Sequence, residues 1–292
     1  MIPKEVIKKI RRIQITTSRM VTDVFAGQYH SVFKGKGMEF HEVREYLPGD
    51  EIRSIDWNVT ARMGQPYVKK FVEERELTVM LVLDASMSCH FGSSEKLKHQ
   101  LAAELCSVLA FSAIQNNDRV GLIVFTDRIE KFVPARKGLR HVLRVVREAL
   151  YYKPENKGTD ISLALEYLNK VTKRSAITFI ISDFFDKDFK KILSASNKRH
   201  DVVAVTITDP RESAMPDIGV INLNDPETGK DLIVDTSDPR LRDQYQKDSV
   251  ERISERKKLL RSINVDSIDI STDAPYDKEL AKFFKMRERR LA

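Results

Sequence analysis

The sequence predicts a doubly wound α/β fold, in which helices cover both faces of a mainly parallel sheet. Short runs such as residues 78–83 and 176–181 are continuously apolar, as expected of strands that have no face in water. Segments with apolar residues at helical spacing separate these runs, and this alternation is typical of a parallel sheet with crossover helices. The chain has 292 residues, of which 41% are hydrophobic and 32% charged, so it is long enough to bury such a core.

The first quarter of the chain has a different texture from the rest. Residues 1–26 carry apolar positions at roughly helical spacing and are followed by Gly27, which predicts one amphipathic helix. Residues 28–76 are rich in glycine, aromatic and charged residues, which favours loops and short strands. We therefore expect an N-terminal segment, residues 1–75, that packs on a main domain formed by residues 76–292.

Within the main domain, strands and helices alternate in order along the chain. Residues 219–235 interrupt this alternation with two short apolar runs around DPETGK, whose Asp, Pro and Gly suit a hairpin turn. The expected strands span residues 78–83, 119–125, 129–133, 176–181, 202–206 and 265–270. The expected helices span residues 95–116, 139–151, 159–172, 187–197, 239–263 and 276–289.

The charge and cysteine content restrict the partners and the compartment. A net charge of +7 would suit nucleic acid, but the excess is diffuse, and the cluster Lys8, Lys9, Arg11, Arg12 is typical of a solvated helix face. The two cysteines form no zinc-type or disulfide spacing, which favours a reducing cytoplasm. Because no apolar run approaches the roughly 20 residues of a spanning helix, and no secretory signal is present, we expect a cytoplasmic protein without a membrane span.

Polar side chains that can bind a metal follow several of the predicted strands. Asp84, Ser86 and Ser88 follow the first apolar strand in LVLDASMSCH, Thr159 starts a helix in KGTDISLAL, and Asp183 ends a strand in FIISDFFD. In open α/β sheets, ligands bind beyond the carboxyl ends of the strands. We therefore expect these five side chains to meet at one edge of the sheet.

Oxygen donors of this kind suit Mg²⁺, which prefers six oxygen ligands and keeps several waters, and Mn²⁺ or Ca²⁺ would suit the same oxygens. We expect Ser86, Ser88 and Thr159 to be direct ligands. Asp84 and Asp183 would supply negative charge and orient the hydroxyls or the metal-bound waters. A carboxylate from a partner would take the open position. The structural alternative is that Thr159 caps its helix and the others are turn residues.

Residues 76–290 resemble a von Willebrand factor A (vWA) domain. The metal-ion-dependent adhesion site of that family has the pattern Asp-x-Ser-x-Ser, then a Thr in a later loop, then an Asp after a later strand. The residues that match this pattern in order are Asp84, Ser86, Ser88, Thr159 and Asp183. The resemblance implies a vWA-like domain whose bound metal recognises an acidic side chain of another protein.

The segment from Tyr29 to Glu74 resembles the signature of the bacterial domain of unknown function 58 family. The matching residues are Gly35, Gly37, Glu39, Phe40, Arg44, Tyr46, Gly49, Asp50, Arg53, Asp56, Trp57, Ala61 and Arg62. The resemblance implies an adaptor or chaperone-like partner of a MoxR-type AAA+ ATPase. From the residues themselves we expect Tyr46 and Trp57 to bury aromatic area against the main domain. The charged residues of the signature suit either an internal salt-bridge network or a second docking surface.

These observations favour a non-enzymatic, Mg²⁺-dependent protein-interaction module. One alternative is a Mg²⁺-dependent phosphoryl hydrolase, because an Asp directly after the first strand is also where an aspartyl-phosphate nucleophile stands. Two features argue against this alternative. An aspartyl-phosphate nucleophile needs a second acidic residue two positions later, where this chain has Ser86, and no suitable lysine follows the end of a predicted strand. The chain also lacks GxSxG, GxxxxGK and HExxH motifs. A basic nucleic-acid-binding protein is the other alternative.

Overall fold

The computed structural model describes residues 38–73, 76–224 and 229–291. They divide into two compact units between Leu77 and Thr78. The helix predicted over residues 1–26 lies outside the described residues.

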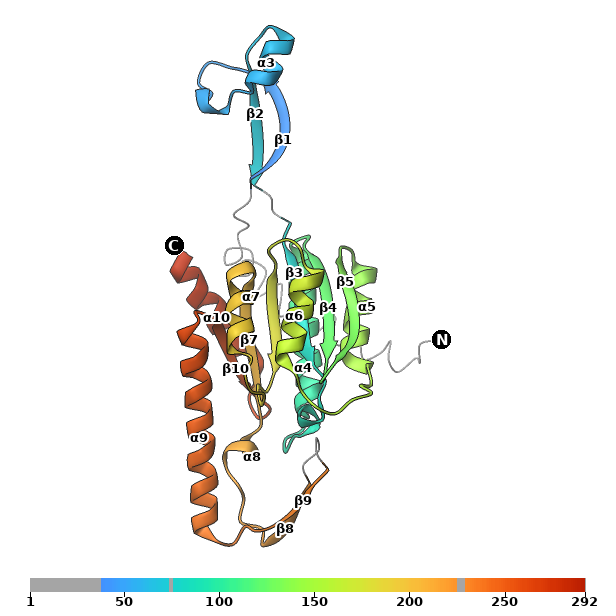
Figure 1. Cartoon of the computed structure of the whole chain (residues 1–292), viewed down its shortest axis with the longest axis vertical. Helices are drawn as coiled ribbons and strands as arrows, with labels where there is room; N and C mark the ends of the chain where they lie inside the picture. Colours follow the sequence, from blue (N-terminus) through green and yellow to red (C-terminus); the bar gives the residue numbers. More distant parts are fainter. Residues whose placement is uncertain (1–37, 74–75, 225–228, 292) are drawn as a thin grey trace. The chain divides into compact units, whose positions relative to one another are not determined.

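The larger unit is built on a six-stranded sheet with the order β10-β7-β6-β3-β4-β5 (Figure 1). Only the edge strand β5 runs antiparallel to its neighbour β4, and the other pairs are parallel. The strands are β3 (Thr78–Asp84), β4 (Arg119–Phe125), β5 (Ile129–Arg136), β6 (Ile177–Ser182), β7 (Asp201–Thr208) and β10 (Asp266–Ser271). This sheet confirms the predicted doubly wound, mainly parallel α/β fold.

Helices cover both faces of the sheet, because side chains of the central strands are buried on each side. Met80 and Val82 of β3 join a core with residues of α6, α7 and α9, whereas Leu81, one residue along, points to the opposite face of the pleat. Figure 1 shows α6 and α7 in front of the sheet, with α4 behind it. The main helices are α4 (Lys98–Gln115), α5 (Leu139–Tyr151), α6 (Ile161–Val171), α7 (Lys190–Arg199), α9 (Pro239–Ser262) and α10 (Tyr276–Leu291).

The order of the strands reverses between β3 and β6, the two central strands. β3 continues through α4 to β4 on one side of the sheet, and β6 continues through α7 to β7 on the other. β3 and β6 pair in register up to Leu83 and Ile181. Their carboxyl ends therefore stand side by side at a topological switch point, which is where open α/β sheets bind ligands.

An extension follows β7. It begins with a one-turn helix that the sequence did not predict, α8 (Pro210–Ser213), and continues with the predicted hairpin of β8 (Val220–Asn224) and β9 (Asp231–Asp235). α9 then returns to the sheet (Figure 1), starting at Pro239 with Asp238 as its N-cap. Nowhere in the part of the chain that the structure describes is a helix both long and apolar enough to cross a membrane.

The smaller unit pairs β1 (Met38–Glu45) with β2 (Tyr67–Glu73) in an antiparallel ribbon. Between them lie a short 3-10 turn, η2 (Ile52–Ser54), and the helix α3 (Trp57–Met63). The expectation of only loops and short strands was therefore wrong for α3. Asp56 starts this helix by accepting hydrogen bonds from the backbone N–H groups of its first turn, and Gly64, at φ 74°, ends it.

Several charged residues of the signature segment pair within the smaller unit. The guanidinium of Arg44 donates two hydrogen bonds to the carboxylate of Asp50, at 2.7 and 2.9 Å. The Lys69 Nζ lies 3.2 Å from Asp56 Oδ2. These pairs favour the internal salt-bridge interpretation for these four residues. Trp57 is 67% exposed, so its own unit does not bury it.

The packing of β4 leads to a testable stability effect at Gly121. A Cβ atom built there would lie 2.7 Å from Met80 Sδ and 3.0 Å from the backbone N of Ala135, which is too close. We expect Gly121→Ala to lower the free energy of unfolding by about 1–3 kcal/mol, as overpacked core positions do. Denaturant unfolding measures this effect. Gly158→Ala is the control, because its nearest neighbour would lie at 3.4 Å, and an equal loss in both variants would contradict the steric account.

Candidate metal site

Asp84 is the last residue of β3 and is buried at the switch point, with 1% of its surface exposed. Its Oδ1 accepts a hydrogen bond from the backbone N of Ser86 at 2.9 Å. Its Oδ2 accepts one from the hydroxyl of Ser182, at the end of the neighbouring strand β6, at 2.6 Å. The carboxylate therefore ties the turn after β3 to the end of β6.

Ser86 and Ser88 lie in the turn that Asp84 begins. Their hydroxyl oxygens are 2.9 Å apart and share a hydrogen bond. Ser86 is fully buried, and Ser88, in the 3-10 turn η3 (Met87–His90), is half-buried. The two hydroxyls and the Asp84 carboxylate thus form one polar cluster, as the Asp-x-Ser-x-Ser spacing predicts.

Asp183 follows β6 and is also buried. Its Oδ1 accepts a hydrogen bond from the backbone N of Phe185 at 3.2 Å. The intervening Phe184 has φ 59°, a left-handed conformation that is strained for a bulky residue. The hydroxyl of Ser182 accepts a hydrogen bond from the N of Phe184 at 3.0 Å and so supports this turn. The strained turn at Phe184 therefore directly follows Asp183, which lies at the switch point.

Thr159 is half-buried, in the loop before α6. The N-cap of α6 is Asp160, whose side chain accepts a hydrogen bond from Leu163 N at 2.8 Å, so the capping alternative for Thr159 was wrong. The loop that carries Thr159 is held to the Ser86–Ser88 turn by a hydrogen bond from Met87 N to the carbonyl of Lys157, at 2.9 Å. The segments that carry all five predicted residues therefore converge at one edge of the sheet.

The start of α6 is also tied to the Asp183 loop. The backbone N of Ile161 donates a hydrogen bond of 2.7 Å to Asp186 Oδ2. Together with the bond between Met87 and Lys157, this contact links the loops that leave β3 and β6 through the loop that carries Thr159.

Burial and repulsion shift the protonation of this cluster. Burial, with the neighbouring charge of Asp183, raises the pKa of Asp84 to about 7, despite the hydrogen bonds from Ser182 and Ser86 that oppose the shift. Burial and the two carboxylates also raise the pKa of the Cys89 thiol well above its usual range. Cys89 is therefore a neutral thiol beside two carboxyl groups.

Lys98 is a further member of the cluster that the sequence analysis missed. It is the first residue of α4, only 1% exposed, and its Nζ donates hydrogen bonds to Asp183 Oδ2 at 2.8 Å and to Glu212 Oε1 of α8 at 2.5 Å. Burial alone would lower the pKa of Lys98, but these carboxylates raise it, so the ammonium is charged. Helical spacing to the buried residues Leu101 and Leu105 was the available signal, because it places Lys98 on the buried face of its helix.

The donors fit a hard divalent cation. Single ligand atoms of Asp84, Asp183 and Cys89 lie within 4.8 Å of one another, and the hydroxyls of Ser86 and Ser88 adjoin Asp84. Two carboxylates, Asp183 and Glu212, share the ammonium of Lys98, and the Asp84 carboxyl lies beside Asp183, so the carboxyl groups of the cluster outnumber its cation. Oxygen donors with excess negative charge suit Mg²⁺, Mn²⁺ or Ca²⁺, whereas a protonated thiol is a poor ligand for these ions.

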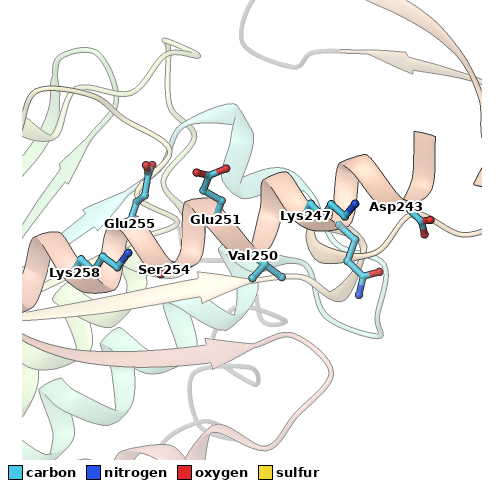
Figure 2. Close-up of a pocket in the computed structure, with 8 residues that line it drawn as sticks. Asp243, Lys247, Val250, Glu251, Ser254, Glu255 and Lys258 are labelled. Atoms are coloured by element: carbon cyan, nitrogen blue, oxygen red, sulfur yellow. The ribbon is translucent and has the colours of Figure 1, made fainter. Parts of the chain in front are cut away.

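A separate hollow of about 620 Å³ lies along α9 and is lined by residues between Asp243 and Lys258 of that helix (Figure 2). None of the predicted site residues lines it. In Figure 2 its labelled side chains are mostly charged and spread along one helix, without converging on a common point. We therefore place the candidate site at the ends of β3 and β6.

Comparison with known proteins gives a family and a set of uncharacterised relatives. The family model described as "Protein of unknown function DUF58" matches residues 42–255. The uncharacterized protein Rv1480 of Mycobacterium tuberculosis is 29% identical over 284 residues, which cover 96% of this chain and 89% of that protein. The uncharacterized protein YeaD of Bacillus subtilis is 23% identical over 161 residues, 55% of this chain and 38% of that protein.

The solved structures that match this chain are more distant in sequence. An aerotolerance-related membrane protein from Bacteroides fragilis is 15% identical, with a TM-score of 0.50 over 73% of this chain and 99% of that chain. BatB from Bacteroides thetaiotaomicron is 16% identical, with a TM-score of 0.47 over the same shares of the two chains. The similarity to the Bacteroides fragilis protein shows that the two chains share a fold.

The raised pKa of Asp84 predicts how the stability of the metal-free protein depends on pH. Below its ordinary pKa of 3.8, Asp84 is protonated in the folded and unfolded chains alike. As the pH rises towards about 7, Asp84 ionises in the unfolded chain while it stays protonated in the folded chain, so the folded state loses stability; above about 7 the loss is complete. Between pH 5 and 7.5 we expect this group to remove on the order of 2–3 kcal/mol.

Denaturant unfolding in the presence of a chelator measures the change. Asp84→Asn removes the titrating group and retains the side-chain oxygen that accepts from Ser86 N. We expect a smaller loss of stability with pH in this variant than in the wild type. Identical pH profiles for the two proteins would contradict the assignment.

Proposed function

Since the chain belongs to the DUF58 family of proteins of unknown function, whose model matches residues 42–255, we propose that it is a non-enzymatic, Mg²⁺-dependent protein-interaction module. The observation that carries the proposal is the meeting of Asp84, Ser86 and Ser88 with Asp183 at the switch point of the sheet. The order and spacing of these residues are those of a vWA-type metal-ion-dependent adhesion site.

In this proposal the hydroxyls of Ser86, Ser88 and Thr159 bind the metal directly. Asp84 and Asp183 orient the hydroxyls and metal-bound waters and supply negative charge. Ser88 and Thr159 are half-buried, whereas Asp84, Ser86 and Asp183 are buried, so a partner would approach the metal from the side of Ser88 and Thr159. When bound, the metal supplies an electrophilic position for a carboxylate oxygen of that partner. Mn²⁺ or Ca²⁺ would occupy the same oxygens.

An aspartyl-phosphate mechanism is less well supported. A nucleophilic carboxylate must reach its substrate, but both oxygens of Asp84 accept hydrogen bonds and the side chain is buried. The raised pKa of Asp84 also reduces the ionised fraction near neutral pH. We therefore propose binding and no turnover.

The partner that we propose is a MoxR-type AAA+ ATPase, as the family resemblance implies, with an Asp or Glu side chain that completes the coordination of the metal. The chain would then act as an adaptor or chaperone-like cofactor, in the cytoplasm and without nucleic acid.

Substitution of Ser86 tests the metal site directly. Ser86→Ala removes one proposed ligand oxygen from a buried position and adds no bulk. We expect Mg²⁺ affinity, measured by isothermal titration calorimetry, to fall by about 10- to 100-fold. Ser107→Ala is the matched control, because Ser107 is an equally buried serine whose hydroxyl donates to the carbonyl of Ala103 in α4. Wild-type affinity in Ser86→Ala would refute the ligand assignment.

Recovery of a MoxR-type ATPase on the immobilised full-length chain tests the partner. Such an ATPase itself requires magnesium nucleotide, so the comparison is made between variants at constant Mg²⁺ and ATP, and a chelator is not used. We expect wild type and Ser107→Ala to retain the ATPase and Ser86→Ala to lose most of it. Equal recovery by all three proteins would show that the interaction does not use the metal.

A further inference from the structure

Lys98 holds a positive charge inside the larger unit, next to the candidate metal site. Its side chain is 1% exposed, and its Nζ contacts Asp183 Oδ2 at 2.8 Å and Glu212 Oε1 at 2.5 Å. A buried ammonium is tolerated only where carboxylates and hydrogen bonds replace water, and Asp183 and Glu212 do so here. The face of the Phe185 ring, 5.5 Å from Nζ, covers the ammonium further.

The contact with Lys98 uses an oxygen of a residue that belongs to the proposed metal site. Asp183 Oδ1 accepts a hydrogen bond from Phe185 N, and Oδ2 accepts one from Lys98, so both oxygens are engaged. A carboxyl oxygen of Asp183 lies within 4.8 Å of one of Asp84. A divalent ion held at this cluster would therefore share Asp183 with an ammonium that is already in place.

We propose that Lys98 is an internal cation that balances Asp183 in the metal-free protein and competes with the divalent metal for it. Glu212 is its second anchor, which retains the ammonium when Asp183 turns to the metal. The inference rests on the proposed function for the identity of the metal-binding residues. It adds a form of regulation: Lys98 offsets the charge of Asp183 in the absence of metal and keeps the metal exchangeable.

The other cations near the Asp183 loop are more remote from its carboxylate. Arg256 of α9 donates to the backbone carbonyl of Asp183 at 3.5 Å, and its second nitrogen pairs with Asp269 at 3.2 Å. Arg252 lies over the Phe185 ring, with its guanidinium carbon 5.8 Å from the ring centre. Lys98 is therefore the cation whose charge acts directly on the Asp183 carboxylate.

Replacement of Lys98 by an uncharged side chain of similar length should expose this competition. Lys98→Met leaves Asp183 and Glu212 without their ammonium, so the cluster carries one more unit of net negative charge. Because charges this close and this buried interact strongly, we expect Mn²⁺ and Mg²⁺ to bind at least about tenfold more tightly. The metal-free variant should unfold at a lower temperature than the wild type, and saturating Mn²⁺ should raise that temperature by more than it does in the wild type.

Two further variants complete the experiment. Lys96→Met removes the same charge two residues earlier, from a side chain that is 46% exposed and pairs with Glu104, and should leave metal affinity unchanged. Glu212→Gln removes one negative charge and the second carboxylate that pairs with Lys98, so the ammonium retains its ion pair with Asp183 alone. We expect it to weaken metal binding by at least about threefold, the opposite direction to Lys98→Met.

Titration calorimetry with Mn²⁺ and Mg²⁺, and thermal unfolding with and without Mn²⁺, are carried out on the full-length wild type and the three variants. Metal binding by the wild type with equal or weaker binding by Lys98→Met overturns the role of Lys98 and leaves the proposed function standing. Binding by Lys98→Met alone supports the role of Lys98 and refutes a metal-dependent function of the wild type. Absence of binding in both overturns both proposals.

Lys98→Met that folds only when Mn²⁺ is added supports the inference. If Lys98→Met does not fold with or without Mn²⁺, the metal affinity of Glu212→Gln is the deciding measurement. A metal affinity of Glu212→Gln equal to that of the wild type overturns the inference.

Discussion

The parallel pairing of β3 with both β4 and β6 is the constraint on which the candidate site depends. Because the chain leaves β3 through α4 and leaves β6 through α7, on opposite faces of the sheet, the two carboxyl ends form a topological switch point. Asp84 and Asp183 lie at the ends of these two strands. The hydrogen bond from Ser182 to Asp84 joins the last residue of β6 to the last residue of β3.

The electrostatic state of this cluster follows from its burial. The ends of fully buried strands are poor places for charge, and the pKa of Asp84 is raised accordingly. Lys98 offsets the charge of Asp183, which the hydrogen bond from the backbone N–H of Phe185 alone would not do. The same ammonium reaches Glu212, and α8 is thereby connected to the loop after β6. An ion that bound at Asp183 would therefore alter contacts on both elements.

In the smaller unit, two carboxylates stabilise local structure through hydrogen bonds and ion pairs. Asp50 accepts a hydrogen bond from the backbone N–H of Leu47, three residues earlier, and Asp56 accepts hydrogen bonds from the first turn of α3. Each carboxylate also pairs with a basic side chain, Asp50 with Arg44 and Asp56 with Lys69. These carboxylates organise short elements in a unit with a small core. Apolar side chains of the unit, such as Trp57 and Ile52, remain exposed within it.

The sequence by itself determined the alternation of strands and helices, because continuous apolar runs and helical spacing are local properties of the chain. It also determined the Asp84, Ser86 and Ser88 cluster, since residues two apart in one turn must lie close together. The one-turn helix α8 and the helix α3 escaped prediction, because both are too short for apolar periodicity, although Asp56 and Gly64 were signals for α3.

Only the tertiary structure decided which charges meet. Asp183 is close to Asp84 because β6 inserts beside β3, and Lys98 reaches Asp183 because α4 starts beside the same strand ends. Thr159 does not cap α6, because the helix begins at Ile161 and its N-cap is Asp160. Local sequence patterns carry no information on such distances, because the pairing of distant strands, and not the spacing along the chain, brings these side chains together.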